Sequence, residues 1–230
     1  MNKKKIASLL VIGALAVGVV GGTFAWFTAS DSVTNPFSTG TTDDPSDPDA
    51  GIKVQEEYKP ETGKNLTPGA EVNKDVQVKS TASYDQFIRV KLDKVWKNAD
   101  GNVITNVTLE GVNYTLDASK IILNYRTANI STNGTEGTWV DGGDGYLYYI
   151  GKVGAASYTN TLLDSVTLSS TAKNEYKSLK FDVIVTAESI QASHGAYKDW
   201  APASIQSYLG IYENKVATAP TNAAEPDGVN

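Results

Sequence analysis

The sequence predicts an all-β domain: a β-sandwich of jelly-roll or Greek-key type with one short C-terminal helix, preceded by a signal peptide and an extended N-terminal arm. Three observations predict it. Short segments in which apolar and polar residues alternate recur between residues 52 and 213. Turn signals rich in Gly, Asn and Asp separate them. An apolar N-terminal run and a Pro-rich acidic stretch come before the first of these segments.

The clearest strand pattern is in residues 87–96, where Ile88, Val90 and Leu92 alternate with charged residues. A period of two is typical of a strand that buries one face. Asp100-Gly101 follows and favours a tight turn, because glycine readily takes a positive φ. Further strands are predicted at residues 76–78, 114–116, 121–125, 138–140, 146–153, 162–168 and 179–187.

One helix is predicted near the C-terminus. Asp199 is the expected N-cap and Pro202 lies in the first turn. The spacing of the apolar residues after it places one group on a single helical face, which we expect to cover an end or an edge of the sandwich: Ile205, Tyr208, Leu209 and Tyr212.

The first 25 residues have the features of a secretory signal peptide. Lys3, Lys4 and Lys5 precede an apolar run over residues 6–20. Thr23 and Ala25 fit the small-x-small rule for cleavage after Ala25, and the cleavage region extends to Ala29. The alternative is an uncleaved anchor, since residues 6–27 are long enough to span a bilayer. Glycines in the run and the lack of a basic flank after Phe27 favour cleavage.

The remaining chain divides into three parts. Residues 26–51 are expected to form an N-terminal arm and a flexible acidic linker, because they are rich in Pro, Gly and Asp and lack periodicity. Residues 52–213 form the β-sandwich domain. Residues 214–230 are a polar tail that carries no structure signals and is expected to be disordered.

The net charge and the lack of cysteine exclude several classes of function. Without Lys3–Lys5, 17 basic residues (20 − 3) face 26 acidic ones, a net charge of about −9. An acidic protein without a basic cluster repels phosphates, so nucleic acid is not an expected partner. The chain has no cysteine, which excludes disulfides and thiolate chemistry.

No catalytic, metal or cofactor site is expected. His194 is the single histidine, and it lies in a loop-forming segment, whereas a zinc peptidase needs two histidines on one helical face. Asp141 and Asp144 flank two glycines, and a plain turn there is favoured over a calcium site, because the glutamate of a calcium loop is missing.

Tyr146 and Tyr148 motivate a different class of function. They are two residues apart in a predicted strand and therefore share a face. An exposed pair of this kind would make an aromatic platform for a sugar, as in a monomeric cell-surface adhesin or glycan-binding module. Cross-strand packing is the favoured explanation of these tyrosines.

Several motifs carry a resemblance to a known family. Residues 20–27 read Val-Gly-Gly-Thr-Phe-Ala-Trp-Phe, and residues 31–40 end in Asn-Pro-Phe-Ser-Thr-Gly. Residues 87–92 and 185–192, followed by Trp200, agree as well. Together they resemble the TasA/camelysin family of exported proteins, and within it the BsaA-type biofilm matrix proteins.

The resemblance implies export, processing by a SipW-type signal peptidase, and assembly into fibres of the extracellular matrix or cell surface. Partners would be copies of the same chain, with a minor anchoring subunit left open. In the family's fibres an N-terminal arm completes the sheet of a neighbour. Carried over, residues 27–40 become the donor arm, with Phe27, Val33 and Phe37 as its buried side chains. Pro36 removes a ladder donor and must lie at a strand end or bulge.

The same resemblance brings a competing activity. Camelysin carries the name of a metalloprotease, and this chain lacks a zinc motif to support that activity. A non-enzymatic, homopolymeric matrix subunit is therefore the expected function, and a monomeric adhesin is the alternative.

Overall fold

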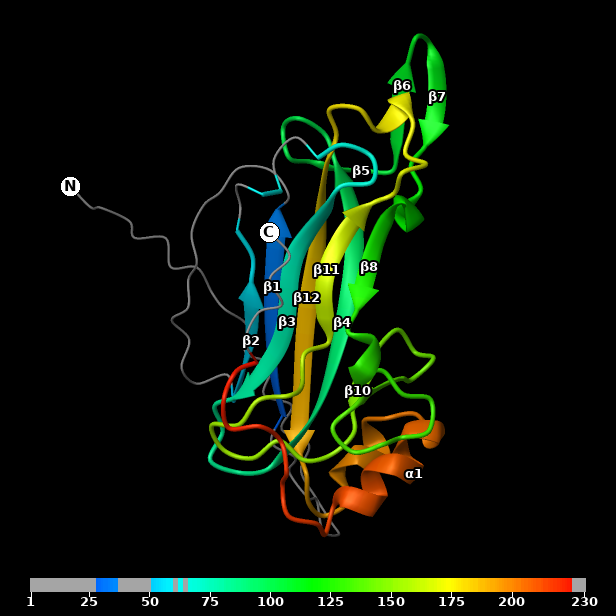
Figure 1. Cartoon of the computed structure of the whole chain (residues 1–230). Coiled ribbons are helices and arrows are strands. Elements are labelled where there is room, and N and C mark those ends of the chain that lie inside the picture. Colours follow the sequence, from blue (N-terminus) through cyan, green and yellow to red (C-terminus); the bar gives the residue numbers. More distant parts are fainter. Residues whose placement is uncertain (1–27, 37–50, 60–61, 64–65, 225–230) are drawn as a thin grey trace, which may run out of the picture.

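The computed structural model of the protein describes residues 28–36, 51–59, 62–63 and 66–224. Two sheets face each other in an elongated β-sandwich, so the predicted fold class is confirmed (Figure 1). The first sheet has the order β1 (Thr28–Pro36), β12 (Lys180–Gln191), β4 (Gln86–Lys97), β10 (Leu147–Tyr149) and β9 (Trp139–Asp141), and β5 (Val103–Ile104) also pairs with β4. The second sheet has the order β2 (Ile52–Glu57), β3 (Glu71–Ser80), β11 (Leu163–Leu168) and β8 (Ile121–Tyr125).

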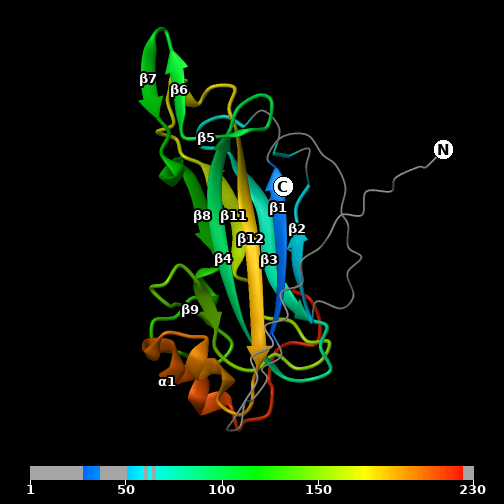
Figure 2. The ribbon, with the colours of Figure 1, turned by 180° about the vertical axis from the view of Figure 1, so that it is seen from behind.

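The smaller elements lie at the two ends of the sandwich and in its loops. β6 (Asn106–Leu109) and β7 (Val112–Thr115) form a two-stranded hairpin that projects from one end of the sandwich (Figures 1 and 2). At the other end lies α1 (Ala203–Tyr212). The described residues also contain four 3-10 turns: η1 (Ala118–Lys120), η2 (Thr127–Asn129), η3 (Asn174–Tyr176) and η4 (Ala196–Asp199).

The main core lies between the sheets and follows from the period of two. On β12, Val183 and Val185 face it and are fully buried. Val90 of β4 and Val76 of β3 supply it from neighbouring and opposite strands. The alternation that predicted the two long strands therefore marks the core face of both.

A second core fills the outer face of the first sheet beneath α1. Ile205 and Leu209 of the helix pack over Phe87 and Ile190. The predicted helix is confirmed, but the predicted Asp199 cap is wrong. The helix begins at Ala203 after Pro202, and Asp199 ends the preceding turn η4.

Tyr149 gives the main core a pH dependence. Its ring packs edge-on against Trp139, with 5.3 Å between ring centroids, and burial raises the pKa of Tyr149 to about 12. In the unfolded chain a tyrosine titrates near 10. Between these values the unfolded state loses a proton that the folded state keeps, so stability falls as pH rises.

We therefore expect alkaline destabilisation on the order of 2 kcal/mol from this residue between about pH 10 and 12. Burial also raises the pKa of Tyr148, which adds loss of the same sign. The free energy of unfolding, measured with urea across this pH range, should fall less with rising pH for Tyr149→Phe than for the unaltered protein. Identical pH profiles would contradict the assignment.

The two ends of the sandwich carry different elements. The α1 end is where β12 finishes at Gln191 and leads to η4 and α1. β2 also begins there, and the Gly51 carbonyl just before it accepts hydrogen bonds from the amides of Thr81 and Ala82. The hairpin end carries β5 and the β6–β7 hairpin, and β5 pairs with β4 at Trp96 and Lys97.

The part of the C-terminal tail that the structure describes, residues 214–224, lies against the domain. The carbonyl of Pro220 accepts a hydrogen bond from the Tyr158 amide at 2.6 Å, and the Ala224 amide donates to Gln77 Oε1 at 3.2 Å. Across the described ranges, no helix has the length and hydropathy needed to cross a membrane.

Candidate assembly interface

The N-terminal arm forms the edge strand of the first sheet. β1 runs antiparallel to β12, from Thr28 opposite Ile190 to Pro36 opposite Asp182. On its other side β12 pairs with β4 along its whole length. Without β1, the backbone donors and acceptors on one side of β12 would form an open edge, which is a template for another strand.

The register shows what a strand at this edge must cover. Val33 lies opposite Val185 and Asn35 lies opposite Val183, two β12 residues that are fully buried in the main core. Residues opposite each other in an antiparallel pair occupy the same face of a sheet. The edge therefore demands both backbone pairing and coverage of the core.

The structure places some of the predicted site residues and leaves others outside the described ranges. Val33 is in β1, and Ala29 of the cleavage region is also in β1, opposite Ser189. Pro36 is the last residue of the strand, the position that a missing N–H requires. Outside the described residues lie Thr23, Ala25, Phe27 and Phe37.

This placement bears on the predicted cleavage. Cleavage after Ala25 leaves the whole of β1 in the mature chain, whereas cleavage after Ala29 removes its first two residues, Thr28 and Ala29. Cleavage at either position leaves residues 30–36 of β1 in the mature chain.

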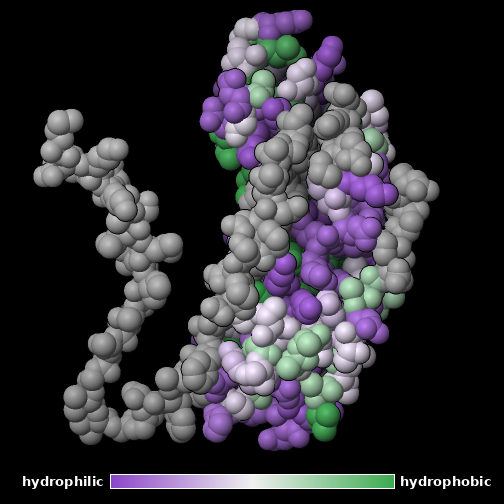
Figure 3. Space-filling model, turned by 90° about the vertical axis from the view of Figure 1, so that its left-hand side faces the viewer, coloured by the Kyte–Doolittle hydropathy of each residue, from purple (hydrophilic) through white to green (hydrophobic). Residues whose placement is uncertain are grey.

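β1 also lies alongside β2, the edge strand of the second sheet (Figure 1). It therefore covers the gap between the two sheets on this side of the sandwich. Seen from this side, the coloured surface is mostly hydrophilic or neutral, and its apolar areas are small (Figure 3). With β1 in place, the visible coloured face offers no broad apolar patch of the kind that marks an interface.

A buried ion pair lies next to this gap. Lys74 occupies the core face of β3 between Val72 and Val76, and its Nζ lies 2.8 Å from Oε1 of Glu56 on β2. The Lys74 side chain is fully buried, and that of Glu56 is 8% exposed. Burial lowers the pKa of Lys74, and the charge of Glu56 opposes this shift. The sequence pattern does not reveal this pair, because polar and charged residues at 73–75 interrupt the apolar alternation of β3.

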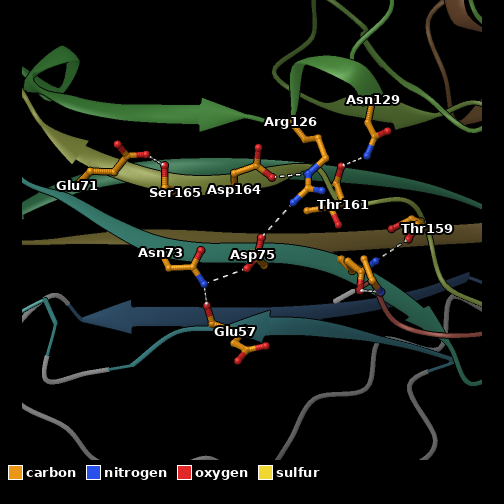
Figure 4. A network of polar contacts seen from close by, with 12 residues as sticks. Glu57, Glu71, Asn73, Asp75, Arg126, Asn129, Thr159, Thr161, Asp164 and Ser165 are labelled. Carbon is orange, nitrogen blue, oxygen red and sulfur yellow. Dashed lines mark hydrogen bonds and ion pairs between the residues drawn. The ribbon is translucent and has the colours of Figure 1, made fainter. Parts of the chain in front are cut away.

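The outer face of the second sheet carries a polar network (Figure 4). Arg126 Nε donates to Asp164 Oδ1 at 2.5 Å, and its guanidinium also approaches Asp75 Oδ1 at 3.6 Å. Asn73 Nδ2 donates to Asp75 Oδ2 at 2.9 Å and to the Glu57 carbonyl at 3.3 Å. These contacts join β2, β3 and β11 to the chain after β8, so the network fixes the second sheet, to which β2 belongs.

Packing, the favoured explanation of Tyr146 and Tyr148, is confirmed, and the alternative of an open sugar platform is contradicted for Tyr148. Tyr148 is fully buried in the second core, where its hydroxyl donates to Asp144 Oδ2 at 2.7 Å. The Arg89 guanidinium stacks 4.1 Å from the Tyr146 ring and 4.6 Å from the Trp200 ring, and binds Glu188 at 2.6 Å. The tyrosines therefore take part in packing and in an ion pair rather than an open aromatic surface.

The residues considered for metal binding have local roles. Asp141 Oδ1 accepts the Gly143 amide at 2.8 Å, and Asp144 Oδ1 accepts the Tyr146 amide at 3.1 Å. Both carboxylates thus stabilise the turn between β9 and β10, as the favoured interpretation had it. His194 is exposed on the loop after β12, with φ of 56°.

The fold and the position of β1 define the class of protein: an all-β sandwich in which an N-terminal strand forms the edge of one sheet. Residues 1–108 match the sequence model of a family described as camelysin metallo-endopeptidase. The match covers just under half of the chain and supports a relationship to the TasA/camelysin family. No curated protein and no solved structure matches the chain.

The donor set does not fit the metal that the family's description implies. The whole sequence contains one histidine and no cysteine. Within the described ranges, no three His, Cys, Asp or Glu side chains are grouped closely enough to hold a metal ion. A zinc peptidase site uses three protein ligands, commonly two histidines and a carboxylate.

Proposed function

We propose that the protein is a secreted, non-enzymatic subunit of extracellular matrix fibres, of the BsaA type within the TasA/camelysin family, and that it assembles by giving β1 to a neighbouring copy. The observation that carries the proposal is the position of β1. It is an edge strand, it pairs with β12 across more than 140 residues of sequence, and it precedes the rest of the domain. Removing it leaves the rest of the described sandwich pairing intact.

Strand exchange needs no new kind of contact. The ladder that β1 makes within one chain can form between two chains in the same register. Since the contacts are equivalent, protein concentration decides between the self-paired and the exchanged state. Each copy gives one strand and receives one, and such a head-to-tail contact extends into a filament unless its rotation closes a ring.

The connecting chain is long enough for exchange. Residues 37–50 join β1 to the start of β2. Fourteen residues span at most about 50 Å when fully extended. A compact domain of this size has a diameter of roughly 40 Å, so a strand held by this connection can reach a neighbour.

The sequence features support the cellular context of the proposal. A positively charged start and an apolar run make the signal peptide, and the motif of residues 20–27 points to a SipW-type signal peptidase. The acidic mature chain fits an exported protein without nucleic-acid partners. Its partners are copies of itself.

Deleting residues 26–40 tests the proposed function. The variant is expected to lose filaments in electron microscopy. The deletion removes the donor strand, so the open edge of β12 has no strand to pair with. Circular dichroism should still report a β-rich domain, since every described strand pairing other than β1–β12 remains. If the deletion impairs folding, a second experiment adds a synthetic peptide of residues 26–40 in excess to the unaltered protein and measures filament length. The peptide should compete for β12 and shorten the filaments, and filaments unchanged by the peptide would contradict the proposal.

A further inference from the structure

We propose that neighbouring copies in the fibre also touch end to end, with the hairpin end of the acceptor packed against the α1 end of the donor through exposed aliphatic side chains. This inference rests on the proposed strand exchange and adds a second surface to it. The partner is another copy of the same chain.

The direction of β1 fixes which ends meet. β1 starts opposite Ile190 at the α1 end and finishes opposite Asp182, toward the hairpin end. The next described strand, β2, starts at Ile52, and Ile52 is opposite Ser80 at the α1 end. Within one chain, the last residue of β1 and the first residue of β2 therefore lie toward opposite ends of the sandwich.

In an exchanged pair these two residues belong to different bodies of the fibre: Pro36 lies on the acceptor and Ile52 on the donor. The donor chain leaves the acceptor sheet toward the acceptor's hairpin end and next enters its own body at its α1 end. The two bodies are then arranged head to tail, with the acceptor's hairpin end facing the donor's α1 end. The tether alone permits a wide gap, up to about 50 Å, so a rigid fibre needs a direct contact to close it.

The exposed aliphatic residues are distributed as such a contact requires. Among the described residues, the large hydrophobic side chains that are exposed lie toward the two ends of the sandwich. At the hairpin end, Val103 is 60% exposed and Val112 is 51% exposed. At the α1 end, Ile211 is 55% exposed and Val216 is 85% exposed. Ile122, at the start of β8, is 40% exposed and also lies toward the hairpin end.

The projecting hairpin strengthens the case for the contact. β6 and β7 pair as strands only with each other in the described chain, and the hairpin projects from one end of the sandwich (Figures 1 and 2). At its base Val107 packs against the main core, whereas Val112 beside the turn is exposed. A two-stranded hairpin is marginally stable in water unless it packs on other structure. Packing Val112, which is next to its turn, against a second copy would stabilise it at the point where the chain gains a neighbour.

Substitution at the two ends tests this inference. Val112→Asp and Ile211→Asp should each raise the protein concentration needed for filament growth by at least about tenfold, since burying an aliphatic side chain contributes about 1.5–3 kcal/mol. Asn113→Asp is the matched control: it adds the same charge one residue away, on the opposite face of the hairpin, and should leave that concentration unchanged. Combining Val112→Glu with Ile211→Lys in one chain should recover part of the loss.

The readout separates this inference from the proposed function. Arm exchange is measured independently. Ser32→Cys chains are mixed with Thr186→Cys chains, and the disulfide-linked dimer is followed. The expected result is that Val112→Asp still exchanges arms while filaments weaken. Unchanged filament growth in Val112→Asp and Ile211→Asp would overturn the end contact and leave strand exchange intact. Loss of arm exchange in these variants would place the residues in the donor site and would overturn it as well.

Discussion

Oxidising the double variant Ser32→Cys/Thr186→Cys as a dilute monomer is expected to abolish filament growth. Ser32 and Thr186 are direct partners in the β1–β12 ladder. Opposite residues in an antiparallel pair have Cα atoms about 4.5–5.5 Å apart, within the range that a disulfide spans. The bond would fix β1 to its own domain, and a copy that cannot release its arm can neither donate nor accept one.

The protein has no natural cysteine, so no other disulfide can form within the double variant. Reduction should restore filaments seen by electron microscopy. A control pair, Ser30→Cys/Ile184→Cys, is out of register, because Ser30 lies opposite Glu188 and Ile184 lies opposite Thr34. Four residues of displacement separate these positions by about 13 Å, too far for a disulfide within one chain. Vigorous filament growth by fully oxidised Ser32→Cys/Thr186→Cys monomers would show that β1 stays in place during assembly.

Glu56→Leu is expected to destabilise the domain by about 3–5 kcal/mol. The substitution removes the carboxylate 2.8 Å from Lys74 Nζ and leaves a fully buried ammonium group without that partner. An uncompensated buried charge is among the costliest single changes in a protein, whereas the intact pair offsets its own desolvation. Urea unfolding of the purified domain measures the effect.

The double variant Lys74→Met/Glu56→Leu is the matched control. It removes both charges and fills the same volume with apolar atoms, so its stability should equal or exceed that of the unaltered protein. The contrast between the single and the double change isolates burial of an unpaired charge from lost packing. Equal losses in both variants would mean that packing, not charge pairing, is what these side chains contribute.

The sequence indicated the long strands because their partners impose a strict period of two. Residues 87–96 and 179–187 became β4 and β12, with apolar residues on the core face. β3 was recognised only at residues 76–78, since Lys74 puts a charge on a core position that the pattern assigns to an apolar residue. The positive φ of Gly101, at 86°, follows directly from the turn chemistry.

The interface was harder to foresee. Residues 28–36 read Thr-Ala-Ser-Asp-Ser-Val-Thr-Asn-Pro, which has little apolar alternation, and the strand's partner lies far away in sequence. Its pairing depends on backbone groups of β12, which leave no trace in the side-chain pattern. The resemblance named Val33 within the arm, whereas nothing local in the sequence identified Val185 as its partner. Packing was favoured for Tyr148, but the strand pattern does not show that its face is the one that α1 covers.

The central claim is that β1 of one copy occupies the β12 edge of another. Two single-cysteine chains test it directly: one carries Ser32→Cys, the other Thr186→Cys, and they are mixed, assembled and then oxidised. Non-reducing electrophoresis with mass spectrometry should show disulfide-linked dimers that contain one chain of each kind, because only an exchanged arm brings these positions together. Filaments that form abundantly from the mixture without such mixed dimers would contradict strand exchange.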